Sequence, residues 1–121
     1  LEFRRVLFRS ATVLDQQPYE SAARLLNTAQ VSVNCADYWG GGQRATLEAM
    51  ACNLPVVVMN DSPKNREYVE ESGCGYIADP NPEAIRTAVY TAIQHRKKKS
   101  RKYVLSKWTH HHYRDALLNA L

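Results

Sequence analysis

A glycine-rich turn that leads into a helix is the segment whose residue types could bind a ligand. Three glycines at 40–42 precede Gln43 and Arg44, after which apolar residues recur at helical spacing. Glycines let the backbone approach a ligand closely, and the free N–H groups of a helix's first turn favour an anion such as phosphate. A flexible turn before an ordinary helix explains the same residues, because neither a Walker pattern nor GxGxxG is present. Gly41, Gly42, Gln43 and Arg44 are therefore candidate ligand-binding residues, and the simpler interpretation stays open.

Glu48 is the acidic residue of the same predicted helix. It falls in the second turn, within an apolar stretch from Ala45 to Ala51. A carboxylate there can accept hydrogen bonds from two adjacent hydroxyls, such as those of a ribose. The alternative is an ion pair with Arg44, four residues earlier on a solvated face, which is worth only ~0.2–0.5 kcal/mol. Spacing alone leaves both interpretations of Glu48 open.

Strands alternate with helices along most of the chain. The clearest predicted strand is 55–59, where a proline precedes three valines and a methionine. A continuous apolar run of this kind suits a parallel strand that is covered on both faces. Shorter strands are predicted at 11–14, 31–35 and 75–78, with helices that begin near Pro18, after Gly42, after Ser62, after Asn81 and at Ser100, the last broken near Thr109. This alternation predicts an α/β fold, a Rossmann-like open parallel sheet flanked by helices. Ligands of such sheets bind at the carboxyl ends of the strands, where the glycine-rich turn falls.

Residues 41–58 resemble the donor-site motif of family 4 (group 1) glycosyltransferases of the GT-B fold. The most specific part is LEAMACNLPVVV at 47–58, and the helix start at 79–85 is similar to the family as well. The resemblance covers about 11–121 and implies the latter part of the family's C-terminal, donor-binding domain. It implies a retaining enzyme that moves a sugar from a nucleotide-diphosphate sugar to a glycan, lipid or small-molecule acceptor. No metal and no cofactor beyond this donor are implied.

The resemblance also implies roles for individual residues. Glu48 matches the family's second motif glutamate, which holds the ribose hydroxyls of the donor, while the backbone of 41–44 approaches the sugar and the diphosphate. Gly40 stands where the family has its first glutamate, which contacts the donor sugar. Asp37, in the preceding loop, is a candidate replacement for that acid. The family's phosphate-binding Arg and Lys, its acceptor site and its N-terminal domain precede the matched residues. Catalytic residues are therefore not assigned, and the chain alone is expected to be inactive.

Two other functions fit the same residues. Gly40 in place of a glutamate is also compatible with a non-catalytic α/β nucleotide-binding module. A GT-B sugar epimerase or phosphorylase is the third hypothesis, and its upstream catalytic residues would differ. The sequence upstream of the matched region distinguishes the three.

The charge of the chain is unevenly distributed. The net charge of +4 is the sum of +2 in residues 1–10, −5 in 11–95 and +7 in 96–121. An acidic body argues against nucleic acid as a partner. The basic stretch at 96–102 is expected to be a solvated connection between helices, with peripheral contact to an acidic membrane surface as the alternative.

The two ends and the cysteines bear on organisation and location. The first ten residues, LEFRRVLFRS, resemble the translation of a linker or adapter. We expect residues 1–10 to be a non-native head and 11–121 to be a partial nucleotide-sugar-binding domain with C-terminal helices. No apolar run approaches the ~18 residues that a membrane span requires. Three cysteines without a CxxC pair indicate free thiols in a reducing compartment. A cytoplasmic protein, with peripheral contact at the inner membrane face as an option, is expected.

Histidines and cysteines are weaker candidates for chemistry. Adjacent helical residues point about 100° apart, so His110, His111 and His112 cannot converge on one ion, and a helix start is expected there. Cys35, Cys52 and Cys74 have no local base, so packing is expected for them rather than catalysis.

Overall fold

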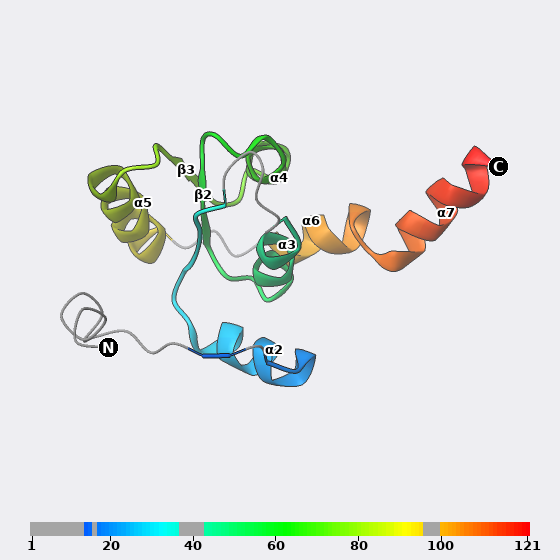
Figure 1. Cartoon of the computed structure of the whole chain (residues 1–121), viewed down its shortest axis with the longest axis horizontal. Helices are drawn as coiled ribbons and strands as arrows, with labels where there is room; N and C mark the ends of the chain where they lie inside the picture. The colour runs from blue at the N-terminus through cyan, green and yellow to red at the C-terminus, as the bar shows by residue number, and fades with distance from the viewer. Residues whose placement is uncertain (1–13, 16, 37–42, 96–99) are drawn as a thin grey trace.

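The computed structural model describes residues 14, 15, 17–36, 43–95 and 100–121 (Figure 1). Helices and strands alternate from α2 to α5, and two more helices follow. In chain order the elements are α2 (Tyr19–Thr28), β1 (Ser32–Asn34), α3 (Gln43–Ala51), β2 (Val56–Met59), α4 (Pro63–Ser72), β3 (Tyr76–Ala78), α5 (Pro82–Gln94), α6 (Ser100–Lys107) and α7 (His110–Ala120). None of these described helices is long and apolar enough to cross a membrane.

The three strands form one parallel sheet in the order β1-β2-β3. Val57 of the central strand pairs with Val33 on one side and with Tyr76 on the other. All four residues of β2 are buried, as the continuous apolar run predicted for a strand covered on both faces. The prediction of an open parallel sheet is confirmed.

Helices cover both faces of this sheet. Val56 and Val58 point to one face, where they pack with buried residues of α3, α4 and α6: Ala49, Met50, Tyr68, Val69 and Val104. Val57 and Met59 point to the other face, where α5 packs with Ala92. Figure 1 shows α5 on one side of the sheet and α3 and α4 on the other. The fold is therefore α/β with a small Rossmann-like sheet between two helical layers.

Local signals set the limits of the helices. Asn81 caps α5, because its Oδ1 accepts a hydrogen bond from the Ala84 N–H at 2.8 Å. Gly73 ends α4 with a left-handed φ of 67°. At Gly75, which has a φ of 116°, an added Cβ would lie 2.8 Å from Val56 Cγ2, so a larger residue would strain the entry to β3.

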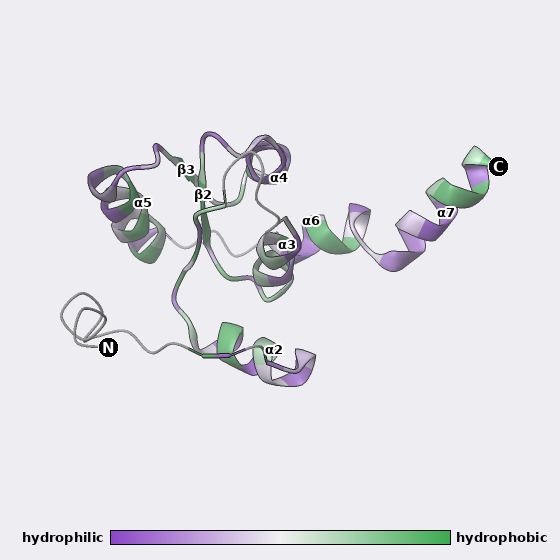
Figure 2. Cartoon of the chain, in the orientation of Figure 1, coloured by the Kyte–Doolittle hydropathy of each residue, from purple (hydrophilic) through white to green (hydrophobic). Residues whose placement is uncertain are grey.

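Some predictions at the edges of the chain were wrong. Leu14 lies outside any strand, and the rest of the predicted strand 11–14 is outside the described residues. The helix predicted to begin near Pro18 is α2, and Pro18, a residue typical of a helix's first turn, is its N-cap residue. The helix break near Thr109 is confirmed. The helical spacing of Tyr113 and Leu117 predicts a shared apolar face on α7, but that face is exposed, with Tyr113 at 73% and Leu117 at 52%. Figure 2 shows hydrophobic residues along α7, which extends away from the sheet.

Candidate functional site

The carboxyl edge of the sheet brings together three helix starts. Because β1, β2 and β3 are parallel, their carboxyl ends lie at one edge. Each strand is followed in the chain by a helix, so α3, α4 and α5 all begin from this edge. Helix starts present N–H groups that lack partners within the helix, which makes this edge the place to look for a ligand.

The start of α3 carries two of the predicted site residues. Arg44 Nε lies 3.1 Å from Glu48 Oε1, so the ion pair weighed as an alternative exists. The Arg44 guanidinium also lies over the Tyr19 ring of α2, 4.9 Å from its centroid. The two charged side chains are 72% and 40% exposed, which leaves the Glu48 carboxylate accessible to a ligand. An exposed pair of this kind is weak enough for a ligand to replace.

The remaining predicted residues of this segment are only partly described. Gln43 is the first residue of α3. Gly41 and Gly42 lie outside the described residues, as do Gly40 and Asp37. The structure thus brings Arg44 and Glu48 together at the helix start.

A polar contact that the sequence did not reveal joins β1 to α3. Asn34 Nδ2 donates to Thr46 Oγ1 at 2.9 Å, and Asn34 Oδ1 accepts from the Ala36 N–H at 2.9 Å. Thr46 is buried although it lies close to the start of the helix. This contact fixes α3 relative to the end of β1 and so positions Arg44 and Glu48. The signal was present as a polar residue at each of two positions that face the core.

The ends of β2 and β3 are joined in a similar way. Asn60 Nδ2 donates to Asp79 Oδ1, which links the two loops directly. Arg66 Nη1 donates to the Asn60 carbonyl at 3.3 Å, and Arg66 Nη2 pairs with Glu70 at 3.0 Å. These contacts hold the loops at the carboxyl edge in one arrangement.

The start of α4 differs from its neighbours in leaving polar groups unpaired. Ser62 occupies the N-cap position and is buried, but its side chain makes no capping hydrogen bond. Asn65 in the first turn is fully buried, and its Oδ1 and Nδ2 have no hydrogen-bond partner. The sequence pattern identified Ser62 as a cap and gave no indication of the unpaired amide.

A hydrogen-bond network attaches α6 to α4. Glu71 accepts from the Tyr103 hydroxyl at 2.6 Å and from Lys107 Nζ at 2.8 and 2.9 Å, and Trp108 Nε1 donates to the Tyr103 oxygen at 2.8 Å. Bonds from Lys107 and Tyr103 lower the pKa of Glu71. Burial, followed by the bond to Glu71, raises the pKa of Tyr103 to about 12. The network is structural, because it holds Trp108 edge-on to Tyr68 with 5.1 Å between ring centroids.

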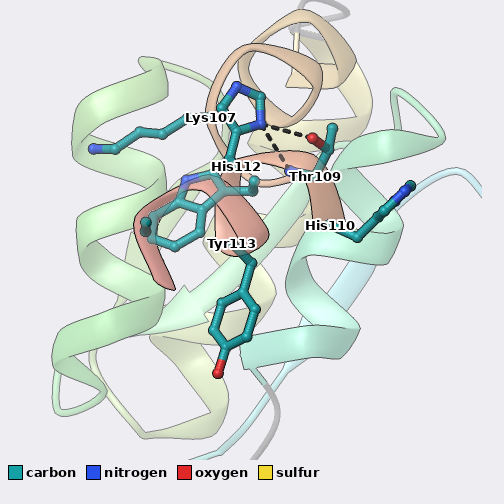
Figure 3. Close-up of a pocket in the computed structure, with 7 residues that line it drawn as sticks. Lys107, Thr109, His110, His112 and Tyr113 are labelled. Atoms are coloured by element: carbon teal, nitrogen blue, oxygen red, sulfur yellow. Dashed lines mark hydrogen bonds between the residues drawn. The ribbon is translucent and has the colours of Figure 1, made fainter. Parts of the chain in front are cut away.

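The histidines lie at the start of α7, as predicted. A pocket of about 360 Å³ lies at this point. Figure 3 shows two of its lining residues, His110 and His112, pointing in different directions. His112 Nδ1 lies 2.6 Å from Thr109 Oγ1 and accepts from the Thr109 N–H at 3.3 Å, which closes a capping box. In the described parts of the chain, no three His, Cys, Asp or Glu residues are placed to hold a metal ion.

The cysteines are free thiols with different exposure. Cys74 is buried and Cys52 is partly buried, which agrees with packing. Cys35 is exposed, so the prediction that it packs was wrong. The reason is its position just beyond β1, where the chain has already left the sheet.

Comparison with known protein families assigns the chain to one of them. The family described as glycosyl transferases group 1 matches residues 8–104, which is more than half of the chain and includes the whole sheet with α3, α4 and α5. Searches of the curated proteins and of the solved structures found no match. The chain belongs to the group 1 glycosyl transferases, a family of sugar-transferring enzymes.

Proposed function

We propose that the chain is the donor-binding part of a retaining glycosyltransferase. It binds a nucleotide-diphosphate sugar, and the intact enzyme transfers the sugar to a glycan, lipid or small-molecule acceptor. The observation that carries this proposal is the position of Glu48. It is an accessible carboxylate one turn into a helix that begins at the carboxyl edge of a parallel sheet.

The two ends of the nucleotide diphosphate suit two different parts of α3. The anionic diphosphate lies against the helix start, where the N–H groups of 41–44 and the positive end of the helix dipole favour it. The ribose lies one turn further along, where the Glu48 carboxylate accepts hydrogen bonds from its two hydroxyls. Arg44, which holds Glu48 Oε1 in the free protein, is exposed and free to turn toward the diphosphate.

Transfer breaks the bond between the anomeric carbon and the diphosphate oxygen and forms one to the acceptor oxygen. Negative charge develops on the leaving diphosphate, and fixed cations stabilise it most effectively. The family resemblance places such cations, together with the acceptor site, before the matched residues. In this proposal the chain binds the donor, and the preceding part of the enzyme provides the cations and the acceptor site.

Glu48→Gln in the full-length protein tests the ribose role. We expect the affinity for UDP or GDP, measured by titration calorimetry, to fall about ten-fold, because a charged hydrogen bond to the ribose becomes a neutral one. Removing the 2′-hydroxyl from the nucleotide should weaken binding to the unaltered protein but make little further difference to the Glu48→Gln variant.

Glu70→Gln is the matched control. Glu70 forms the same type of i,i+4 pair with an arginine, at 3.0 Å and with similar exposure, but on α4. Its substitution should leave nucleotide affinity unchanged. If Glu48→Gln binds the nucleoside diphosphate as tightly as the unaltered protein, the ribose role is wrong.

A further inference from the structure

Asn65, in the first turn of α4, is a buried amide without a partner. It is 0% exposed, and neither Oδ1 nor Nδ2 forms a hydrogen bond. Buried side-chain amides are nearly always paired, because an unpaired donor or acceptor has lost its water without compensation. Within the described part of the chain, Asn65 is the one residue with such buried, unpaired side-chain nitrogen and oxygen atoms.

Asn65 lies on the buried face of α4, in the first turn of the helix. Asn65 shares the inner face of the helix with Tyr68 and Val69, which pack in the core beside β2. Because side chains on a helix tilt toward its N-terminus, we expect the amide to face the helix start. Ser62 makes no capping hydrogen bond, so the first turn of α4 lacks a side-chain cap next to the unpaired amide of Asn65.

The chemistry of these groups favours a hydroxyl as their partner. Asn65 has both a donor and an acceptor to satisfy, and a hydroxyl can donate and accept, whereas a phosphate at neutral pH mainly accepts. The nearby cation, Lys64, already donates to Glu67 Oε2 at 2.8 Å. The start of α4 is therefore better suited to a polyhydroxylated ligand than to a second phosphate.

We infer that the start of α4, with Asn65 as its central group, is a subsite for hydroxyls of the transferred sugar. This inference rests on the proposed function, in which the nucleotide occupies the start of α3. The two helices pack against each other and begin at the same sheet edge, so one ligand can contact both starts. The amide has no solvent contact in the free protein. Binding therefore includes a shift of the exposed surface around Asp61, in the turn before α4, and Pro63, the first residue of α4.

The test compares sugar-bearing and sugar-free nucleotides in the full-length protein. Asn65→Leu removes both polar atoms, and Asn65→Ala removes them without adding volume should the leucine prevent folding. Titration with UDP, UDP-glucose, GDP and GDP-mannose gives the four affinities for each variant. We expect the sugar nucleotide of the preferred base to bind about ten-fold more weakly to both variants, with affinity for its nucleoside diphosphate unchanged.

Asn27→Leu, the same change at an exposed position in α2, is the matched control and should alter neither affinity. Equal binding of sugar nucleotides to the unaltered protein and to both Asn65 variants would overturn the inference and leave an ordered water as the partner of the amide. Equal loss of sugar nucleotide and nucleoside diphosphate would also overturn it, since Asn65 would then act on the nucleotide. Failure of the unaltered protein to bind any of the four would overturn the proposed function itself.

Discussion

The starts of α4 and α5 have nearly the same sequence pattern, but the N-cap side chain accepts a hydrogen bond only in α5. Each helix begins with a proline that follows a capping-type residue, Ser62 in α4 and Asn81 in α5. In α5 the cap accepts from the Ala84 N–H at 2.8 Å. The corresponding N–H in α4 belongs to Asn65, and it donates no hydrogen bond to the Ser62 side chain.

This difference separates a structural helix start from a functional one. The α5 start is satisfied within the chain, so it needs no ligand and stabilises the fold by itself. The α4 start buries an amide and leaves it unpaired, which lowers stability unless a ligand completes the bonds. Departures from the usual rules of stability occur most often at binding and catalytic sites. The unpaired amide of Asn65 is such a departure, and it lies beside the predicted nucleotide site.

Asn65→Leu should give the largest change in stability and the most direct test of this comparison. Removing two unpaired buried polar atoms is expected to raise the free energy of unfolding by about 1–3 kcal/mol. Urea denaturation of the variant and of the unaltered protein measures the difference. A gain in stability with a loss of sugar-nucleotide affinity is the outcome that marks a functional residue.

Asn65→Ala keeps this prediction testable if the larger leucine overpacks the core. It is expected to be less destabilising than ordinary truncations of buried side chains. A loss of about 3 kcal/mol or more in Asn65→Ala would show that the amide is well paired in solution, and the contrast with α5 would disappear.

The contrast also marks where prediction from sequence succeeded. The strand at 56–59 and the helix that begins after Asn81 follow from local chemistry: a continuous apolar run in the strand, and a capping residue followed by proline in the helix. The pairing of Arg44 with Glu48 is observed, and it is one of the two interpretations that helical spacing left open for Glu48.

What the sequence did not reveal depends on contacts between distant elements. Whether Ser62 caps α4 depends on backbone angles at the end of β2, and whether Asn65 is paired depends on what packs around it. The spacing of residues along α4 predicts neither the capping by Ser62 nor the pairing of the Asn65 amide. The apolar stripe of α7 was predicted from its period, but period alone says nothing about whether another element covers it, and the stripe is exposed.

Asn81→Ala should have the next largest effect, with the opposite sign. Loss of the cap on the Ala84 N–H is expected to lower the free energy of unfolding by ~1 kcal/mol. Urea denaturation measures this change, and nucleotide affinity should stay the same. A variant that keeps full stability would mean that the α5 start, like that of α4, is not satisfied by its cap.

The start of α3 is intermediate between these two, because the charged side chains of Arg44 and Glu48 are paired but exposed. Glu48→Gln is expected to lower the free energy of unfolding by only ~0.2–0.5 kcal/mol, the value of an i,i+4 ion pair, and Glu70→Gln should match it. Denaturation of both variants under the same conditions makes the comparison. A much larger loss for Glu48→Gln would assign that residue a structural role beyond its pair with Arg44.

Ser62→Ala should change stability least, although a serine at the N-cap position is ordinarily worth ~1 kcal/mol. In α4 the Ser62 side chain makes no capping bond, so its hydroxyl contributes nothing that alanine would remove. The free energy of unfolding is expected to stay close to that of the unaltered protein in urea denaturation. A loss equal to that of Asn81→Ala would mean that Ser62 caps α4 in solution. The start of α4 would then be satisfied as α5 is, and Asn65 would lose the uncapped neighbourhood on which the sugar subsite depends.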